Sequence, residues 1–371
     1  MSLVVLTNIP TPYRTAFFDA VAAEAARRGR GFHVLYCAET EPGRHWPYEP
    51  AAMRHAHTML RGVHPRLAGL SAHVNPGVLA ALRALRPTTL LVAGAWNTPT
   101  MLLAGWSGVP CRRIFWSEGH ADAVLHPRGL VAWARRRAYR SYDAFAVPNG
   151  RSADWARAQA GEAKPIVELP NAVDTDFYRP AAAEPKAAAR RELDLPPSAR
   201  ILVQVGALTE RKGPVPLARA FLALPPAARG EAVLLLVGTG PQEAELRTLA
   251  AGSRGALRLS GQLDPAGVRQ VLQAADVFVL NTFLDPNPLS PIEAAACGLP
   301  LVLSSRAGNI DELITGPGLG CAVADPAAPG DALRTALAWA ESERASRGAR
   351  AREVAERAFA LPALARRLVG E

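Results

Sequence analysis

Cysteine is scarce in this sequence of 371 residues. Its four cysteines are Cys37, Cys111, Cys297 and Cys321. They lie far apart and form no C-x-x-C pair, which argues against a disulfide scaffold and a structural zinc site and suits a reducing cytoplasm. The histidines show no metal-ligand spacing either, because His55-x-His57 lacks a third ligand. We therefore expect no metal site.

Lysine is scarcer still. It occurs only at Lys164, Lys186 and Lys212, so the formal net charge of +9 comes almost entirely from arginine. The arginines are scattered, with one tight cluster at Arg135–Arg137 and Arg140, and no nucleic-acid-binding motif is present. We expect no nucleic-acid partner, whereas a sugar nucleotide or a phospholipid surface is compatible with the charge.

Long apolar runs are also absent. No stretch approaches the roughly 20 apolar residues of a membrane span. The N-terminal run Leu3–Leu6 has no basic lead and no cleavage site, so it predicts a buried strand rather than a secretion signal. These absences predict a cytoplasmic protein, either soluble or associated with a membrane surface.

The sequence does contain a repeated alternation of short β-rich runs with longer alanine-rich runs, which is typical of parallel α/β layers. The predicted strands are Leu3–Leu6, Phe32–Cys37, Leu90–Ala93, Cys111–Trp116, Ala144–Val147, Ile201–Val205, Val233–Val237, Leu257–Leu259, Val277–Leu280 and Leu301–Leu303. The predicted helices are Phe17–Arg28, Leu79–Leu85, Leu130–Arg140, Val215–Leu224, Gln242–Ala250, Pro265–Ala274, Pro291–Ala296, a region after Asp331 and Ala349–Leu368. Residues 39–75 are assigned no regular structure.

A shift to alanine, charge and proline over Pro180–Pro197 predicts an inter-domain linker. The fold class we predict is α/β, with two Rossmann-like doubly wound domains that face a cleft. Residues 1–178 would form the first domain and residues 179–349 the second, with a C-terminal helix at about 350–371 packing back on the first. In such folds a ligand binds at the carboxyl ends of the strands.

The segment from Asn281 to Pro300 carries the most informative pattern. A strand ends at Leu280, a proline-rich loop follows, and a short helix is predicted with Ser290 as N-cap and Pro291 at its first position. Such a loop would present backbone N–H groups and a helix N-terminus to a diphosphate.

Two carboxylates of this segment each allow two interpretations. Glu293 could accept two hydrogen bonds from a ribose diol, or it could close a capping box with Ser290, and the spacing favours neither. Asp285 could reach the hydroxyls of a sugar, or it could serve only as a turn residue before proline.

Two glycine-containing loops follow strands of the second half. The loop from Gly206 to Gly213 offers Arg211 and Lys212 as cations for phosphate oxygens, and Val237–Pro241 is a tighter turn. Each loop is also compatible with an ordinary connection between a strand and a helix.

In their order along the chain, these motifs resemble the retaining GT-B glycosyltransferases, in particular family 4, the "group 1" glycosyltransferases. The resemblance covers most of the chain. The boxes that carry it are Leu169–Phe177 (PNGVDxxxF), Gly206–Gly213 (GRLxxxKG), Val237–Pro241 (VGxGP), Ala275–Val279 (ADVFVxPS), Asp285–Glu293 (Glu-x7-Glu, continued by EAxACGLPV) and Gly308–Glu312 (GGxxE).

The resemblance implies that the second domain binds the donor and gives its motif residues roles. Lys212 would hold the donor diphosphate, Glu293 the ribose, and Asp285 the hydroxyls of the transferred sugar. The other donor-binding residues it implies are Gly206, Arg211, Gly238, Gly261, Gln262 and Leu263 (the last three near the base), and Leu289 and Ser290, which would bind phosphate through their amides.

The sequence departs from the family pattern at several positions. Ala207 stands where the family has an arginine, and Arg211 could replace that cation. Asp285 stands in place of the first glutamate of its box, and residues 287–288 are Asn-Pro rather than Phe-Gly. The first loop, residues 8–14, lacks the family's glycine pair.

We place this first loop, with Tyr13 and Arg14, on the acceptor side, although a proline-fixed loop with a solvated Arg14 is an equal alternative. His120 follows a first-half strand where relatives often have an active-site histidine, and Glu118 is the neighbour that could fill the role. The predicted catalytic residues are thus Asp285, Glu293, Lys212 and His120.

The sequence therefore predicts a hexosyl-type transferase that moves a sugar from a nucleotide-diphosphate sugar to a hydroxyl acceptor with retention, as in polysaccharide biosynthesis. We expect no cofactor and no metal, because a lysine and a helix N-terminus would stabilise the leaving diphosphate. Two alternatives stay open, a sugar-nucleotide epimerase on the same scaffold and a non-catalytic sugar-nucleotide-binding protein. A dinucleotide dehydrogenase is disfavoured, because no G-x-G-x-x-G follows the first strand.

The predicted helix Leu130–Arg140 carries Trp133 beside Arg135–Arg137 and Arg140. This composition could place the helix on anionic lipid, and an ordinary solvated face is an equal alternative.

Overall fold

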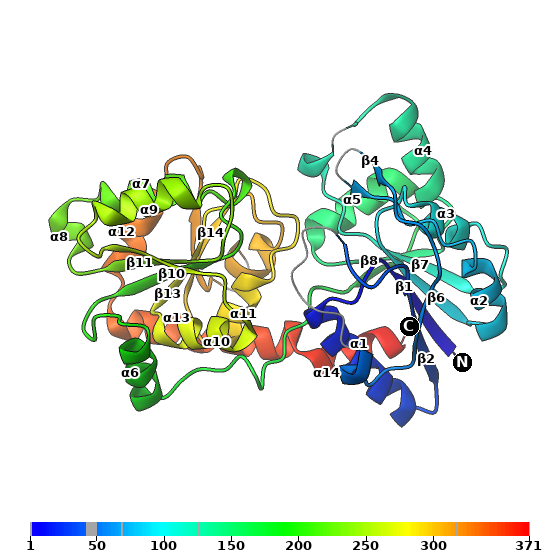
Figure 1. Ribbon diagram of the computed structural model, residues 1–371, viewed down its shortest axis with the longest axis horizontal. Coiled ribbons are helices and arrows are strands. Elements are labelled where there is room, and N and C mark those ends of the chain that lie inside the picture. The colour runs from blue at the N-terminus through cyan, green and yellow to red at the C-terminus, as the bar shows by residue number, and fades with distance from the viewer. Residues whose placement is uncertain (1, 42–49, 68–69, 125, 316–317, 371) are drawn as a thin grey trace. The chain divides into compact units, whose positions relative to one another are not determined.

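The computed structural model describes residues 2–41, 50–67, 70–124, 126–315 and 318–370. The chain divides into two compact units, Met1–Ala172 with Leu361–Glu371, and Val173–Ala360 (Figure 1). The chain therefore leaves its first unit after Ala172 and returns to it at Leu361. The sequence placed these changes at residue 178 and at about residue 350.

The first unit contains a seven-stranded parallel sheet in the order β3-β2-β1-β6-β7-β8-β9. Its strands are β1 (Ser2–Thr7), β2 (Gly31–Tyr36), β3 (His57–Met59), β6 (Thr89–Ala93), β7 (Arg112–Trp116), β8 (Ala144–Val147) and β9 (Ile166–Glu168), and a separate antiparallel pair is formed by β4 (Arg66–Leu67) and β5 (Leu70–Ser71). Continuous apolar runs form the central strands because helices cover both faces of the sheet.

Two helices pack on one face of this sheet, α1 (Pro12–Arg27) and α14 (Leu361–Gly370). The elements of the other face are α2 (Val78–Leu85), α3 (Pro99–Gly105), α4 (Gly129–Tyr139) and α5 (Gly150–Ala160). Two short 3₁₀ turns are η1 (Pro50–Ala52) and η2 (Ala121–Ala123). The sequence missed α3, α5, β3 and β9, and it started α1 too late.

The second unit repeats the plan with a six-stranded parallel sheet in the order β12-β11-β10-β13-β14-β15. Its strands are β10 (Ile201–Val205), β11 (Val233–Val237), β12 (Leu257–Gly261), β13 (Val277–Leu280), β14 (Leu301–Ser304) and β15 (Gly320–Val323).

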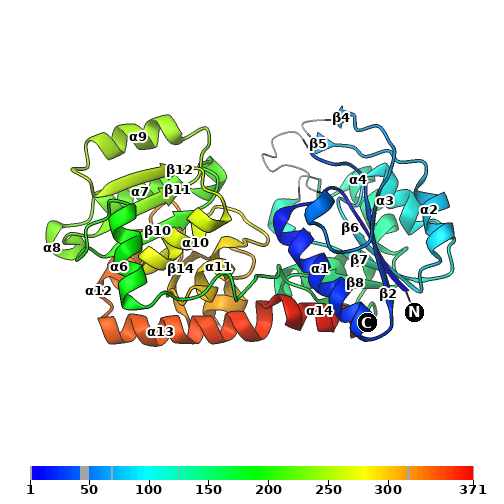
Figure 2. The ribbon, with the colours of Figure 1, turned by 60° about the horizontal axis from the view of Figure 1, so that its bottom comes forward.

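Helices cover both faces of this sheet as well (Figure 2). The elements on one face are α7 (Pro214–Leu222), α9 (Glu243–Ala251) and α12 (Gly330–Ala338), and those on the other are α6 (Ala183–Glu192), α10 (Pro265–Ala274), α11 (Ser290–Ala296) and α13 (Glu341–Val354). The shorter elements are η3 (Glu210–Lys212), α8 (Pro226–Arg229), and the π-helical turns η4 (Asp311–Thr315) and η5 (Ala355–Phe359).

The predicted linker Pro180–Pro197 is wrong as a description of this segment, because it contains α6 and belongs to the second unit. Pro185 lies in the first turn of α6, where proline is tolerated. The helix is held by Arg190, which donates to Asp276 Oδ2 at 2.7 Å and to Ala274 O at 3.0 Å.

Both sheets confirm the predicted α/β fold class, since each has the strand order of a Rossmann-like domain. In each sheet the direction of winding reverses beside the first strand, between β1 and β6 and between β10 and β13. Loops that leave the carboxyl ends of such neighbouring strands diverge and create room for a ligand. Among the described residues, no helix is long and apolar enough to cross a membrane.

Candidate functional site

In the second unit, the loops that follow β10 and β13 are tied together at the point where the winding reverses. Asn281, directly after β13, donates from its side chain to Gly213 O at 3.1 Å and to Pro326 O at 2.8 Å. Its backbone N–H donates to the Gln204 side chain at 3.1 Å. The two loops therefore form one framework rather than two independent segments.

Arg211 reinforces this framework. Its carbonyl accepts from Thr282 Oγ1 at 2.9 Å and from Phe283 N at 2.8 Å, and its guanidinium donates to Leu284 O at 2.7 Å. Arg211, which the sequence analysis named as a possible replacement for the missing phosphate-binding cation, thus also connects the two loops.

Lys212 and Asp285 meet across these loops. The ammonium and the carboxylate form an ion pair, and their side chains are only 13% and 12% exposed. Gly213 makes this approach possible, since its φ of +59° is left-handed and a Cβ there would lie 2.2 Å from Asn281 O. The structure thus brings together two residues that the sequence assigned to one site.

Glu293 lies in the first turn of α11, the helix that directly follows the loop after β13. The helix begins at Ser290 itself, with Leu289 in the preceding position and no side-chain cap, so the predicted N-cap at Ser290 is wrong and the capping box does not form. The Tyr178 hydroxyl donates to the Glu293 carboxylate instead. Burial nevertheless raises the pKa of Glu293 to about 7.

Three glycines line the neighbouring strand ends. A Cβ at Gly238 would lie 2.1 Å from Gly206 O, so these two backbones can touch only because residue 238 carries no side chain. Gly238 N donates to Gly261 O at 2.8 Å, which links the end of β11 to the end of β12. Next to Gly261, the Gln262 side chain accepts from Thr239 Oγ1 at 3.3 Å, and Leu263 follows it.

Two backbone donors complete the constellation. The N–H groups of Leu289 and Ser290, which precede and open α11, make no hydrogen bond with other described residues. Unpaired donors at the start of a helix attract anions. The carboxyl ends of β10 to β13 thus carry an ammonium, free amides and two carboxylates, a set suited to a diphosphate joined to sugars.

The first unit has a cavity of about 390 Å³ at the carboxyl ends of β1, β6 and β7. Four of its polar lining residues are Asn8, Tyr13, Arg14 and Glu118. Asn8 and Arg14 each have a buried polar atom without a hydrogen-bond partner among the described residues, Oδ1 and Nε. Buried polar atoms of this kind are rare in native proteins, and they mark a place where a polar ligand would be held.

Arg14 is not solvated, so that alternative is wrong. Its side chain is 15% exposed and donates to Thr7 Oγ1 at 3.0 Å and to Glu118 Oε1 at 3.4 Å. Its guanidinium carbon lies 5.0 Å from the centre of the Trp116 ring. Burial opposes the charge, but the neighbouring Tyr13 and Glu118 outweigh it, and the pKa of Arg14 is raised.

His120 is buried and precedes η2. Its Nδ1 accepts from Asp122 N at 3.2 Å, so the proton of the neutral ring is on Nε2. Burial lowers the pKa of His120, which favours this neutral form. Nε2 is buried and has no partner among the described residues, and His120 is not one of the residues that line the cavity.

Several residues of these sites escaped sequence analysis. Tyr178 directly follows the box at Leu169–Phe177, yet nothing local shows that it contacts Glu293. In the first unit, Glu41 lines the cavity and contacts His73 Nε2 at 2.8 Å. It comes from residues 39–75, which had no clear periodicity, and part of that stretch (42–49 and 68–69) lies outside the described residues.

The helix α4 presents an apolar and basic surface to solvent. Leu130 is 77% exposed and Trp133 is 62% exposed, and Arg136, Arg137 and Arg140 are exposed on the same helix and at its end. The predicted cluster needs one correction. Arg135 is buried, because it donates to the Gln159 side chain at 3.0 Å and stacks on Trp155.

Within the described part of the chain, no group of three or more histidine, cysteine, aspartate or glutamate side chains could hold a metal ion. The four cysteines are all free thiols.

Residues 185–356 match the family model described as "Glycosyl transferases group 1". The segment lies within the second unit, and the match confirms the resemblance there. A D-inositol 3-phosphate glycosyltransferase of Actinosynnema mirum is 35% identical over 134 residues, which are 33% of this chain and 32% of that protein. A glycogen synthase of Mycobacterium tuberculosis is 36% identical over 157 residues, 41% of this chain and 37% of that protein. The match thus spans about a third of the length of these curated relatives.

Solved structures are similar over the whole chain. The Anabaena protein HepE, in complex with UDP and glucose, has a TM-score of 0.73 at 15% identity, covering 100% of this chain and 98% of that one. WaaG, a glycosyltransferase involved in lipopolysaccharide biosynthesis, has a TM-score of 0.69 at 16% identity, covering 100% and 98%. At these identities the likeness shows the fold, which is the GT-B arrangement of two Rossmann-like domains in one chain.

Proposed function

We propose that this chain, whose residues 185–356 belong to the glycosyl transferases group 1 family, transfers a sugar from a nucleotide-diphosphate sugar to a hydroxyl acceptor. The observation that carries the proposal is the assembly of Lys212, Asp285 and Glu293 beside the free amides of Leu289 and Ser290, at the point where the second sheet reverses its winding. HepE, a protein of similar fold, was crystallised with UDP and glucose.

In this proposal each donor group has its own anchor. The diphosphate lies against Lys212 and the amides of Leu289 and Ser290, where an ammonium and the positive end of α11 meet its charge. The ribose hydroxyls donate to Glu293. The close backbone approach at Gly206 and Gly238 lets the nucleotide contact the main chain, with the base near Gly261, Gln262 and Leu263.

Asp285 contacts the transferred sugar. In the unliganded protein its carboxylate is neutralised by Lys212. When the diphosphate draws the ammonium toward itself, the carboxylate is released to accept hydrogen bonds from sugar hydroxyls. The missing cation at Ala207 makes Lys212 and Arg211 the basic side chains of this loop, so we expect a strong dependence on Lys212.

The chemistry we propose is retaining transfer. Breaking the glycosyl–phosphate bond leaves positive charge on the sugar and negative charge on the diphosphate, which Lys212 and the α11 amides stabilise. The leaving phosphate takes the proton of the acceptor hydroxyl, so no separate base is needed. These groups make a divalent cation dispensable, and we expect the transfer rate to be unchanged by EDTA.

The first unit supplies the acceptor side. Its cavity of about 390 Å³ holds Arg14 in a fixed position between Glu118 and Trp116, with the unpaired Asn8 Oδ1 nearby on the wall. His120 lies outside this lining, and its role toward the substrate stays a prediction. A polar acceptor with hydroxyl groups suits this lining.

The exposed Leu130 and Trp133, together with the arginines of α4, support contact of this surface with anionic lipid at the cytoplasmic side of a membrane, which is part of the proposal. This orientation would give access to a lipid-linked acceptor.

A panel of nucleotide sugars scored by thermal shift tests donor binding, because a ligand of the native state raises the unfolding temperature. Glu293→Gln should weaken the apparent affinity for the nucleotide sugar at least about tenfold, and the ligand-induced thermal shift should be smaller accordingly. Glu243→Gln is the matched control, since Glu243 also lies in the first turn of a helix of this unit but pairs with Arg247.

A transfer assay then separates the candidate activities. Lys212→Ala should slow transfer by about 100-fold or more, and Asp285→Asn should act chiefly on sugar choice. A transferase releases free nucleotide only when acceptor is present, an epimerase converts the sugar without acceptor, and a binding protein does neither. Unchanged transfer in all three site variants would refute the assignment.

A further inference from the structure

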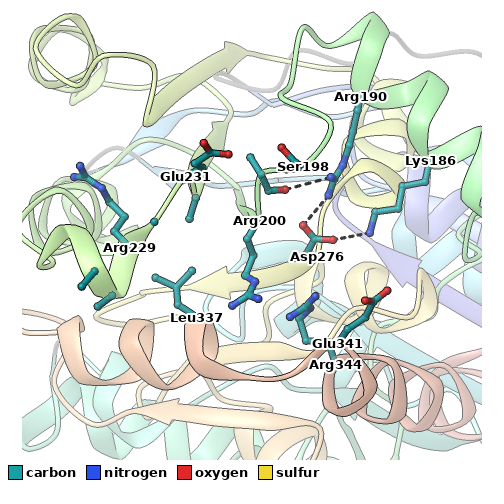
Figure 3. Close-up of a pocket in the computed structure, with 15 residues that line it drawn as sticks. Lys186, Arg190, Ser198, Arg200, Arg229, Glu231, Asp276, Leu337, Glu341 and Arg344 are labelled. Atoms are coloured by element: carbon teal, nitrogen blue, oxygen red, sulfur yellow. Dashed lines mark hydrogen bonds and ion pairs between the residues drawn. The ribbon is translucent and has the colours of Figure 1, made fainter.

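A second cavity of the Val173–Ala360 unit opens at the opposite edge of its sheet (Figure 3). Its volume is about 670 Å³. The residues that precede β10, β11 and β13 form its floor, and α6, α8, α12 and α13 contribute walls. The groups assigned to the donor follow the carboxyl ends of the strands, so this cavity is separate from the proposed donor site.

Basic side chains predominate around the cavity. Five of the lining residues are basic and three are acidic. The basic residues are Lys186, Arg190, Arg200, Arg229 and Arg344, and the acidic residues are Glu231, Asp276 and Glu341. The balance is therefore positive.

The most enclosed of these carboxylates, Asp276, is already fully engaged. One oxygen pairs with Lys186 Nζ at 2.7 Å, and the other pairs with Arg190 Nη2 at 2.7 Å and accepts from Ile201 N at 2.8 Å. Arg190 also donates hydrogen bonds to the carbonyl oxygens of residues 274, 197 and 199. These three side chains form a network, and the other three cations of the cavity lie outside it.

Arg200 and Arg344 are two of the three cations outside this network, and the third, Arg229, donates to Leu222 O at 3.0 Å. Arg200 is half-buried, its side chain makes no hydrogen bond or ion pair with the described residues, and in Figure 3 it extends toward α13, which carries Arg344. Arg344 donates to Trp339 O at 2.7 Å. Burial and the nearby Arg344 charge lower the pKa of Arg200. Two like charges are thus held near each other at the wall of a cavity.

We propose that this cavity binds a phosphorylated small molecule whose phosphate lies between Arg200 and Arg344. A phosphate dianion can accept from two guanidinium groups at once, so it would replace their repulsion by two charge-assisted hydrogen bonds. The volume falls within the range of about 300–1,000 Å³ usual for small-ligand sites. Arg229 would meet a further anionic or hydroxyl group of the same molecule.

Isothermal titration with inorganic phosphate and with glucose 6-phosphate, in a chloride buffer of fixed ionic strength, tests this site. Because the proposed donor loop would also attract phosphate, the titrations use the Lys212→Ala chain. Both probes should bind to the cavity of this chain, and glucose 6-phosphate should bind more tightly than inorganic phosphate. Glucose, which has no phosphate, should not bind. A further Arg200→Ala or Arg344→Ala substitution should weaken binding at least about tenfold.

The matched control is Arg191→Ala in the same background. Arg191 lies on α6 next to Arg190, but it is exposed and pairs with Glu184 at 3.4 Å outside the cavity, so binding should persist. If Arg200→Ala fails to fold by circular dichroism, Arg344→Glu provides the test, because a carboxylate beside Arg200 removes the phosphate site while easing the repulsion. Three results would overturn the proposal. They are the absence of binding in the Lys212→Ala chain, equal binding after the Arg200 or Arg344 substitutions, and binding only to phosphatidic acid vesicles.

Discussion

At the scale of single residues, burial changes the chemistry of Glu293. Its pKa is raised from an ordinary value of 4.5 to about 7. A carboxyl group with a raised folded-state pKa contributes stability that is complete below pH 4.5 and is lost as the pH rises through 7. Above pH 7 the ionised carboxylate lowers the stability of the folded protein, and this ionised form is also the better hydrogen-bond acceptor for ribose hydroxyls.

The measurable consequence concerns Glu293→Gln, whose amide stays neutral at every pH. The stability advantage of the variant over the parent should be about 1–3 kcal/mol larger at pH 8 than at pH 5. Thermal unfolding of both proteins at the two pH values measures this. Glu243→Gln should not reproduce the gain, and a Glu293→Gln advantage that is equal at pH 5 and pH 8 would contradict the assigned pKa.

Sequence spacing could find Lys212, Asp285 and Glu293, because each lies in a local motif that follows a strand. It could not find Tyr178, whose contact with Glu293 depends on tertiary packing, nor could it decide between the cap and ribose interpretations of Glu293. The start of α11 removes the cap interpretation, because Ser290 is already helical and caps nothing, and ribose binding by Glu293 stays a prediction.

At the scale of elements, the loop between β10 and α7 depends on one glycine. Gly213 has a φ of +59°, and an alanine Cβ there would lie 2.2 Å from Asn281 O. Gly213→Ala should cost about 3 kcal/mol, through a left-handed alanine and the displaced loop, and should weaken nucleotide-sugar binding by moving Lys212. Denaturant unfolding and the thermal-shift panel measure the two effects.

Gly230 offers the matched control for that change. Its φ is +57°, and no atom lies within 4 Å of the position of a Cβ. Gly230→Ala should therefore cost only the backbone conformation, φ +57° with ψ −138°, about 1–3 kcal/mol, and leave nucleotide-sugar binding unaltered. An equal loss of nucleotide-sugar binding in the two variants would show that the Gly213–Asn281 approach is unimportant.

The exposed surface of α4 makes a second element-scale prediction. Reversing Arg136, Arg137 and Arg140 to glutamate should reduce binding to anionic vesicles at least about tenfold, since each arginine near such a surface contributes about 1 kcal/mol. Vesicle co-sedimentation measures it. Reversing three exposed arginines of the second unit, Arg191, Arg219 and Arg247, should have little effect. Retained binding after the α4 reversal would reject this surface.

Elements with strong periodicity or long apolar runs were predictable, and those that depend on tertiary contacts were not. Helix α6 contains Pro185 and many charges, so it resembles a linker until Arg190 is seen bonded to Asp276. Strand β9, Ile166–Glu168, is too short to show a pattern. Helix α5 did carry a signal, since Asn149 caps it by accepting from Ser152 N at 2.9 Å.

At the scale of the whole molecule, the repeated alternation of strands and helices predicts two sheets, but it does not show where the chain passes from one unit to the other. The second passage is decided by packing. After η5 the chain changes units at Leu361, and α14 then buries an apolar face against the first sheet and α1. The buried side chains of α14 are Leu364, Ala365, Leu368 and Val369.

This packing predicts that the C-terminal helix stabilises the first unit and not the unit that precedes it in sequence. A chain ending at Ala360 would lose three large apolar contacts, worth on the order of 5 kcal/mol. Hydrogen exchange should therefore become faster in β1, β2 and β6, while β10, β11 and β13 keep their protection. Leu364→Ala with Leu368→Ala in the full-length chain should give the same pattern in weaker form. Faster exchange spread equally over both sheets, or confined to the second, would show that α14 does not act through the first core.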